Sequence, residues 1–226
     1  MSRTLTTART QMDRLPPFDQ LTVLRSELDD TFQAGPEERK RRKPFIIDEI
    51  LEMLIMAYMF GNEAANTMLY GSDVVDQIEP EQEGPNRVID IDTDDMNRAV
   101  FKVVAGKNWE QRITEYLDDE NGTVDDVIRV VDTDMNRIYN DSILNVGERA
   151  EDEEPADGAP KQGVMKTWQT MLDNRVRDTH EYLEGMTVPV GRRFYTYDGD
   201  SARYPGDFSN PANSINCRCR ISLSMA

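Results

Sequence analysis

A long, buried helix is the strongest structural prediction from this sequence. The run PFIIDEILEMLIMAYMF covers residues 44–60, and its aliphatic side chains recur at spacings of three and four residues. Apolar residues also occupy the other sides, which indicates a helix buried on several sides. The run is shorter than a bilayer span and carries Asp48, Glu49 and Glu52. We therefore expect a core helix over 45–70, no membrane anchor, and an apolar surface so wide that the chain orders fully only when docked on a partner.

Further helices are expected on both sides of this run. The segment 21–34 has a helical pattern, 94–119 reads as two helices broken at Gly106, and 123–146 reads as helical throughout. Thr123 with Asp126 three residues later resembles a capping box. The expected organisation is an N-terminal arm over 1–43 followed by a helical region over 44–146.

The stretch GERAEDEEPADGAPKQG (147–163) marks a change in the character of the chain. It is acidic, rich in Pro, Gly and Ala, and nearly free of large apolar side chains, so it predicts a linker or loop. Beyond it, 164–226 combines one short helical run with Gly-, Pro- and Asn-rich turns and short β-rich runs. We expect an α+β fold: a mainly helical N-terminal region followed by a small loop-rich C-terminal module with short strands.

Charge is unevenly distributed along the chain. The formal net charge is -17, and residues 1–160 carry 17 basic and 36 acidic side chains against 9 and 7 in residues 161–226. Such an excess of acid excludes a general nucleic-acid coat, since binding phosphates needs surplus Lys and Arg. The dense basic run is a candidate contact for a partner protein or DNA, with a solvated helix start as the alternative; it comprises Arg39, Lys40, Arg41, Arg42 and Lys43.

The only histidine, His180, and the only two cysteines, Cys217 and Cys219, all fall in the last module. They could supply three zinc ligands, with Asp178, Asp207 or water as the fourth. The spacing argues against this, because one residue separates the cysteines where zinc sites have two to four. A thiol hydrolase would need the same His180 and Cys217, and a Cys-x-Cys disulfide would be strained.

A simpler interpretation of NSINCRCRISLS (213–224) is an amphipathic terminal strand. Alternation places Cys217, Cys219 and Ile221 on one face and the two intervening arginines on the other. Free cysteine is commonly buried as a small hydrophobe. We favour this strand and expect no cofactor, while zinc at His180 and the two cysteines stays open as the alternative.

The ordered motifs of the last module resemble those of the phage Mu F-like minor head proteins, strongest over 164–221. A LDNRVRDTH segment, a Pro-Gly-Asp turn and a closing NCRC carry the resemblance. Its positions are Trp168, Asp173, Arg175, Arg177, His180, Gly185, Pro189, Phe194, Gly199, Pro205, Gly206, Asp207, Asn216, Cys217, Arg218 and Cys219.

This resemblance implies a minor structural protein of a tailed bacteriophage head, made in the bacterial cytoplasm and located in the virion. Such a protein is expected at the portal vertex or capsid interior, in head assembly or the handling of packaged DNA. Its implied partners are the portal protein, the major capsid protein and DNA, and no catalytic residue is implied. The alternatives are a nucleic-acid-binding accessory protein and a metal- or thiol-dependent hydrolase using His180, Cys217 and Cys219.

Overall fold

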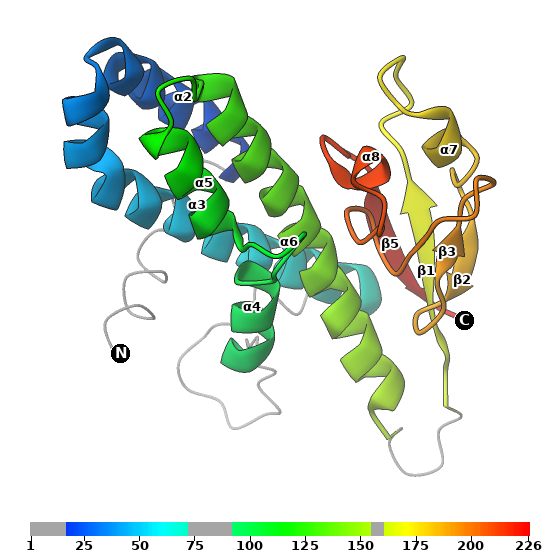
Figure 1. The fold of residues 1–226 in the computed structure, drawn as a ribbon. Helices are drawn as coiled ribbons and strands as arrows, with labels where there is room; N and C mark the ends of the chain where they lie inside the picture. Colours follow the sequence, from blue (N-terminus) through cyan, green and yellow to red (C-terminus); the bar gives the residue numbers. More distant parts are fainter. Residues whose placement is uncertain (1–16, 72–91, 155–160) are drawn as a thin grey trace, which may run out of the picture.

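The computed structural model describes residues 17–71, 92–154 and 161–226. Five helices form its N-terminal part: α2 (Pro17–Gln33), α3 (Pro36–Tyr70), α4 (Thr93–Val100), α5 (Trp109–Asp118) and α6 (Val124–Asp152). The C-terminal part contains β1 (Val164–Gln169), α7 (Asp178–Glu181), β2 (Thr187–Pro189), β3 (Phe194–Tyr195), β4 (Ser201–Ala202), α8 (Pro211–Ser214) and β5 (Arg220–Met225). Figure 1 shows the helices on one side, the strands on the other, and α6 running alongside the strands. The α+β prediction is confirmed.

Two antiparallel sheets organise the C-terminal module. The three-stranded sheet has the order β2-β1-β5, and in its central register Trp168 pairs with Ile221. Strands β3 and β4 form a separate two-stranded sheet. The chain is therefore brought back so that its last strand lies beside β1, the first strand of the module.

Two hydrophobic cores share the long helices α3 and α6. The first core buries side chains of α2, α3, α4, α5 and α6, including Leu28, Leu54 and Ile113. The second core joins Ala65 of α3 and Ile143 of α6 to the apolar faces of the sheets. The wide apolar surface predicted for 45–70 is thus largely covered by helices of the same chain, with Phe45 left 73% exposed.

Helices α3 and α6 lie in close contact at Gly61. A Cβ atom added there would lie 2.4 Å from the carbonyl oxygen of Tyr139 and 3.0 Å from Cβ of Ser142. Beside this point, Ser142 Oγ donates a hydrogen bond of 2.7 Å to the carbonyl of Tyr58. Glycine is needed here because only a residue without a side chain lets the two backbones come this close.

Several predicted helices are confirmed. Segment 21–34 forms most of α2, 94–119 contains α4 and α5, and 123–146 lies in α6. Thr123 and Asp126 make the predicted capping box, since each side chain accepts a hydrogen bond from the other's backbone N–H. Among the described residues, no helix is both long and apolar enough to cross a bilayer.

The expected arm over 1–43 is corrected where the structure describes it, from residue 17 onward. Helix α2 buries Leu24 and Leu28 in the first core, because its apolar residues share one face. Helix α3 begins at Pro36, so the boundary expected at residue 43 lies inside a helix that also contains Pro44. Arginine and lysine are good helix formers, and Pro at the first helical position is well suited to a helix start. Residues 1–16 lie outside the described residues.

The acidic segment expected as a linker over 147–163 is also corrected in its first part. Helix α6 continues to Asp152, because this end of the helix is held against the C-terminal module. Gly147 is buried against side chains of Val190 and Leu223, and Glu148 forms an ion pair with Arg203. Residues 155–160 of the segment lie outside the described residues.

Candidate metal centre

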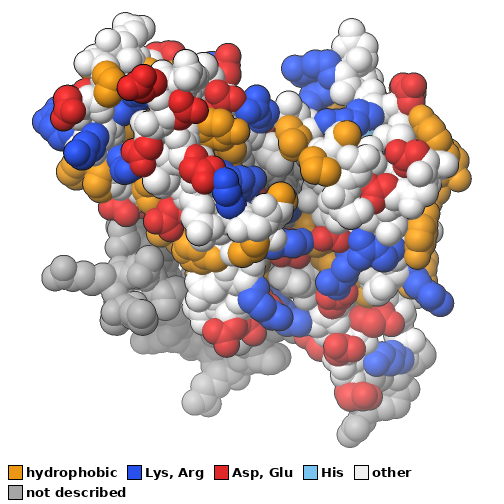
Figure 2. Space-filling model, viewed as in Figure 1, with side chains coloured by type: hydrophobic (Ala, Val, Ile, Leu, Met, Phe, Trp, Pro, Cys, Tyr) orange, Lys and Arg blue, Asp and Glu red, His pale blue; other side chains and the backbone are white. Residues whose placement is uncertain are grey.

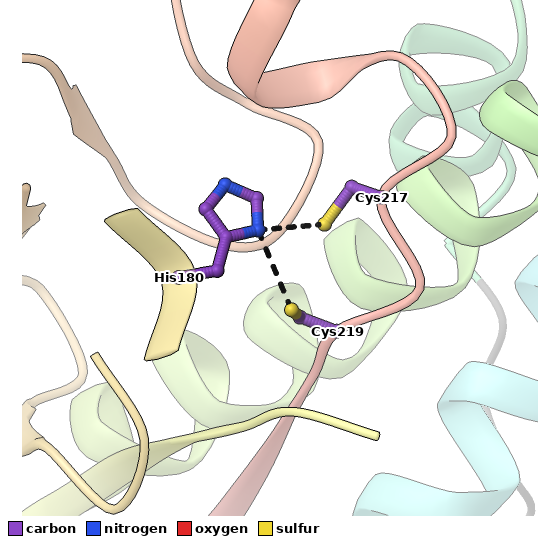
Figure 3. Close-up of side chains that lie close together, drawn as sticks. All are labelled: His180, Cys217 and Cys219. Atoms are coloured by element: carbon purple, nitrogen blue, oxygen red, sulfur yellow. Dashed lines mark hydrogen bonds between the residues drawn. The ribbon is translucent and has the colours of Figure 1, made fainter. Parts of the chain in front are cut away.

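One histidine and two cysteines meet in the interior of the C-terminal module. His180 comes from α7, whereas Cys217 and Cys219 come from the extended segment before β5. Nδ1 of His180 lies 3.6 Å from Sγ of Cys217 and 3.5 Å from Sγ of Cys219. Figure 3 shows both thiols pointing at this one ring nitrogen. The three donor atoms lie within 4.8 Å of one another.

The cluster is closed to solvent. His180 is 1% exposed, and Cys217 and Cys219 are each 3% exposed. Burial alternates from 217 through 223, with the odd positions buried and the even ones partly exposed. The predicted inward-facing thiols are therefore confirmed, although β5 itself begins only at Arg220. This alternation is what aims both thiols at α7.

Aromatic rings fix the orientation of the His180 imidazole. Its ring stacks on Phe208, with centroids 5.2 Å apart and an interplanar angle of 20°. Trp168, fully buried on β1, meets it edge-on at 5.5 Å. These contacts leave Nδ1 facing the thiols, while Nε2 has no hydrogen-bond partner within the described part of the chain.

Two buried asparagines of α6 hold the backbone that carries the thiols. The Nδ2 group of Asn136 donates to the carbonyl oxygens of Cys217 (2.8 Å) and Cys219 (3.2 Å). Asn140 donates to the Cys219 carbonyl (3.2 Å) and accepts from the backbone N–H of Ile221 (2.9 Å). Each amide satisfies backbone groups that burial would otherwise leave unpaired.

The two thiols differ in acidity. The hydrogen bond with Cys219 lowers the pKa of Cys217, and the charges of Arg177 and Arg218 act in the same direction. The same hydrogen bond, with burial, raises the pKa of Cys219. An imidazole and two thiols in one buried cluster are a donor set suited to a soft or borderline metal ion.

Other family-motif residues brace the segment that contains the cysteines. Asp173 pairs with Arg218 at 2.6 Å, and the hydrogen bond from Arg218 lowers the pKa of Asp173 to about 2. Arg177 donates to the carbonyl of Ile215. Asn216 adopts a left-handed φ of 56° at the turn into the cysteines. Gly185 turns the chain after α7 with a φ of 71°, and its N–H donates a hydrogen bond of 2.9 Å to the Trp168 carbonyl. The side chain of Arg175, another motif residue, is exposed.

The Pro-Gly-Asp turn (205–207) docks the module onto α6. Gly206 has a φ of 92°, and an added Cβ would lie 3.0 Å from Cβ of Arg137. The carboxylate of Asp207 pairs with Lys102 at 2.8 Å and with Arg193 at 3.5 Å. Asp207 is therefore engaged away from the cysteines. Within the described residues, neither it nor Asp178 joins the group of candidate metal ligands, so the expectation of a carboxylate as the fourth ligand is not supported.

The basic run at 39–43 lies in the first turns of α3 and is largely engaged within the chain. Arg39 is buried and donates to the carbonyl of Asp119 at 2.8 Å. The remaining pairs join Arg41 and Arg42 to Glu38 and join Lys43 to Asp118, whereas Lys40 is exposed. The contact of this run with a partner stays a prediction. Carboxylates of the same chain already pair with three of its five basic side chains.

A family model described as phage Mu protein F-like protein matches residues 94–222. The chain belongs to this family. The resemblance predicted from the motif residues is thereby confirmed. The Mu F-like region begins at α4 and ends in β5, so it includes α6, which carries Asn136 and Asn140, while α2 and α3 precede it.

Two curated proteins each match part of the chain. The chain is 30% identical over 63 residues to the minor head protein GP7 of Bacillus phage SPP1, covering 28% of this chain and 20% of that protein. It is 38% identical over 56 residues to the NAD(+)–arginine ADP-ribosyltransferase EFV of Enterococcus faecalis, covering 25% of this chain and 11% of that protein. The matches thus span a small part of each relative's length. No solved structure matches the chain.

Sequence reasoning missed the asparagines that anchor the Mu F-like cysteine segment. Asn136 and Asn140 are four residues apart, so they share one face of α6. Asp134, nearly fully buried beside them, pairs with Arg112 at 2.6 Å and Arg137 at 3.1 Å. The available signal was the four-residue spacing of two asparagines within a segment predicted to be helical.

Proposed function

We propose that this Mu F-like chain is a minor structural protein of a tailed bacteriophage head, located in the virion at the portal vertex or capsid interior. It acts there in head assembly or in the handling of packaged DNA. The observation that carries the proposal is the family match over residues 94–222, which covers more than half of the chain. The partial match to a phage minor head protein supports the same role.

The burial of the motif residues favours a structural protein over a hydrolase. His180, Cys217 and Cys219 are each at most 3% exposed, so a substrate could not reach them without opening the module. The surrounding motif residues have structural roles: Trp168 is buried in the core, Gly206 forms a turn, and Asp173 forms an ion pair with Arg218. A nucleophile and its base need access to the bond that they attack. The thiol hydrolase therefore has little support.

An apolar edge of the C-terminal module is the surface that we propose for docking to the portal or major capsid protein. Figure 2 shows apolar side chains along the outer edge of the module, away from the helices. Tyr182 and Tyr197 meet edge to face with ring centroids 5.9 Å apart, and these two and Tyr195 are each 55–62% exposed. Exposed tyrosines suit protein interfaces because their rings bury area while their hydroxyls keep a polar contact.

A nucleic-acid-binding accessory role is the weaker alternative. The net charge is -17. Within the described residues, carboxylates and a backbone carbonyl engage Arg39, Arg41, Arg42 and Lys43 of the basic run, and Lys40 is exposed. We therefore propose a protein partner as the first contact, with packaged DNA as a secondary one.

Virion composition tests this proposal. Purified particles of the encoding phage should contain the chain at a copy number far below that of the major capsid protein, measured by quantitative mass spectrometry. Deleting its gene should reduce the yield of DNA-filled heads, and the full chain supplied in trans should restore it. Absence from particles together with normal head yield after deletion would refute the role.

A pair of variants tests the docking surface. Tyr195→Ser with Tyr197→Ser should lower incorporation into particles, whereas Phe45→Ser, which changes an even more exposed aromatic side chain on α3, should not. Circular dichroism of each purified variant would establish that its fold is retained. Equal incorporation of both variants would exclude the tyrosine edge as the docking surface.

A further inference from the structure

We propose that His180, Cys217 and Cys219 bind one structural zinc ion that fastens α7 to the segment before β5. The proposal is independent of the role in the phage head. It rests on the geometry, donor chemistry and charge of the cluster, together with its place in the module.

The two nitrogen–sulfur distances match those of a zinc site. Zinc binds cysteine sulfur at about 2.3 Å and histidine nitrogen at about 2.0–2.1 Å in a tetrahedral arrangement, which places N and S about 3.5–3.6 Å apart. Nδ1 of His180 lies 3.6 Å and 3.5 Å from the two sulfurs. Because all three donor atoms lie within 4.8 Å of one another, one ion could bind all of them once the two sulfurs are about 3.8 Å apart, as tetrahedral geometry requires.

The charge of the site fits its burial. A zinc ion with two thiolates and a neutral imidazole has no net charge, and a neutral assembly avoids the high cost of burying an isolated ion. The three donors are at most 3% exposed. Thiolate and imidazole ligands together favour zinc over the hard cations magnesium and calcium, which prefer oxygen.

The location gives the ion a structural task. His180 is 37 residues from Cys217 and 39 from Cys219, and the module between them has only short strands and two four-residue helices. Small modules of this kind commonly need a cross-link, because their cores are limited. Asn136 and Asn140 of α6 pre-position the cysteine backbone through its carbonyls.

The fourth position is assigned to a water molecule. Within the described part of the chain, no carboxylate joins the three donors. Asp207 pairs with Lys102 and Arg193 instead. Asp178 begins α7, two residues before His180, and lies outside the group.

The test uses the full chain, purified under reducing conditions without chelator. Elemental analysis should find about one zinc per chain. Replacement by Co²⁺ should give the near-ultraviolet charge-transfer absorption of cobalt–thiolate bonds. This band is specific for the proposed site, because it requires a thiolate ligand and Cys217 and Cys219 are the only cysteines in the sequence. It requires no variant, so it decides the question even if cysteine variants fail to fold.

Variants then locate the ion. Cys219→Ser and His180→Ala should lose the bound metal, whereas the control Asp178→Asn should keep it. Removing the metal with a chelator should make the wild-type thiols reactive and lower the midpoint of thermal unfolding. Absence of stoichiometric zinc with no cobalt–thiolate band would overturn the proposal, as would full zinc retention by folded Cys219→Ser protein. Loss of metal by Asp178→Asn would overturn the assignment of water as fourth ligand.

Discussion

Replacing Gly61 by alanine should destabilise the protein, although alanine is the better helix former. The added Cβ would lie 2.4 Å from the Tyr139 carbonyl oxygen, whereas Cβ atoms essentially never approach another heavy atom within 3.0 Å. Helices α3 and α6 must then separate by at least 0.6 Å. Neither obstacle is the end of a flexible side chain, since one is backbone and the other is Cβ of Ser142. The strain therefore cannot be relieved by a rotamer change.

The size of the effect follows from three contributions. Alanine gains about 1 kcal/mol over glycine in a helix interior, whereas overpacking costs about 3 kcal/mol at the upper end of its usual range. Separation of the helices also weakens the hydrogen bond from Ser142 to the Tyr58 carbonyl, which is worth about 1 kcal/mol. We expect a net loss of about 2–3 kcal/mol in the free energy of unfolding, or about 5–10 °C in the thermal midpoint for a chain of this size.

Urea denaturation followed by circular dichroism measures this loss, with Gly147→Ala as a matched control. A Cβ at Gly147 would lie 3.0–3.1 Å from methyl groups of Val190 and Leu223, which are the ends of side chains that can shift. The control should therefore change the free energy of unfolding by less than about 1 kcal/mol. The reasoning fails if Gly61→Ala is as stable as the wild type, or if the control is destabilised more.

Three further predictions concern buried or charged side chains. Asn140→Ala should cost about 1–3 kcal/mol in urea denaturation, because the buried N–H of Ile221 loses its partner while the Cys219 carbonyl keeps only Asn136; an unchanged free energy of unfolding would contradict this. Burial, with the charge of Glu27, raises the pKa of Glu49 to about 7, so the folded state loses stability as pH rises from 4.5 through 7. Glu49→Gln should therefore have a higher thermal midpoint than the wild type at pH 8 and a shrinking advantage toward pH 5; a constant difference would refute the cause. The pKa of Asp173 is lowered to about 2 by an arginine hydrogen bond, so its contribution is present above pH 3.8 and lost as pH falls through 2. Asp173→Asn should be less stable at pH 7 and converge with the wild type near pH 2, and a gap that persists there would exclude this pair as the source.

Local patterns in the sequence predicted most of the helices, because the residues that signal a helix lie within about one helical turn of one another. The pairing of Thr123 with Asp126 fixed the start of α6, and apolar spacing placed α2, α3 and α5. The alternation around Cys217 predicted which side chains face inward. Each of these inferences needs only neighbours within four residues.

The errors and omissions arose where distant residues decide the outcome. Helix α6 extends into an acidic segment because Arg203, far along the chain, pairs with Glu148. The approach of His180 to two thiols 37 and 39 residues away depends on how the sheet and α7 pack. No local pattern contains either contact. The motif resemblance identified the participating residues without indicating their distances.

Helix α6 contributes residues to both cores, so the rotation about the helix axis between the two groups of residues is fixed. The buried apolar residues of α6 in the first core are Val127, Val130, Val131, Met135 and Ile138, and those in the second core are Ile143, Leu144 and Val146. Inserting one residue between these groups would rotate one set by about 100° relative to the other and shift it by 1.5 Å. Both cores could then not be packed at once, whereas an insertion of seven residues, close to two turns, would nearly restore the rotation. Seven extra residues would still shift one set by about 10.5 Å along the helix axis, so the number of residues between the two groups sets how the helices and the C-terminal module face each other.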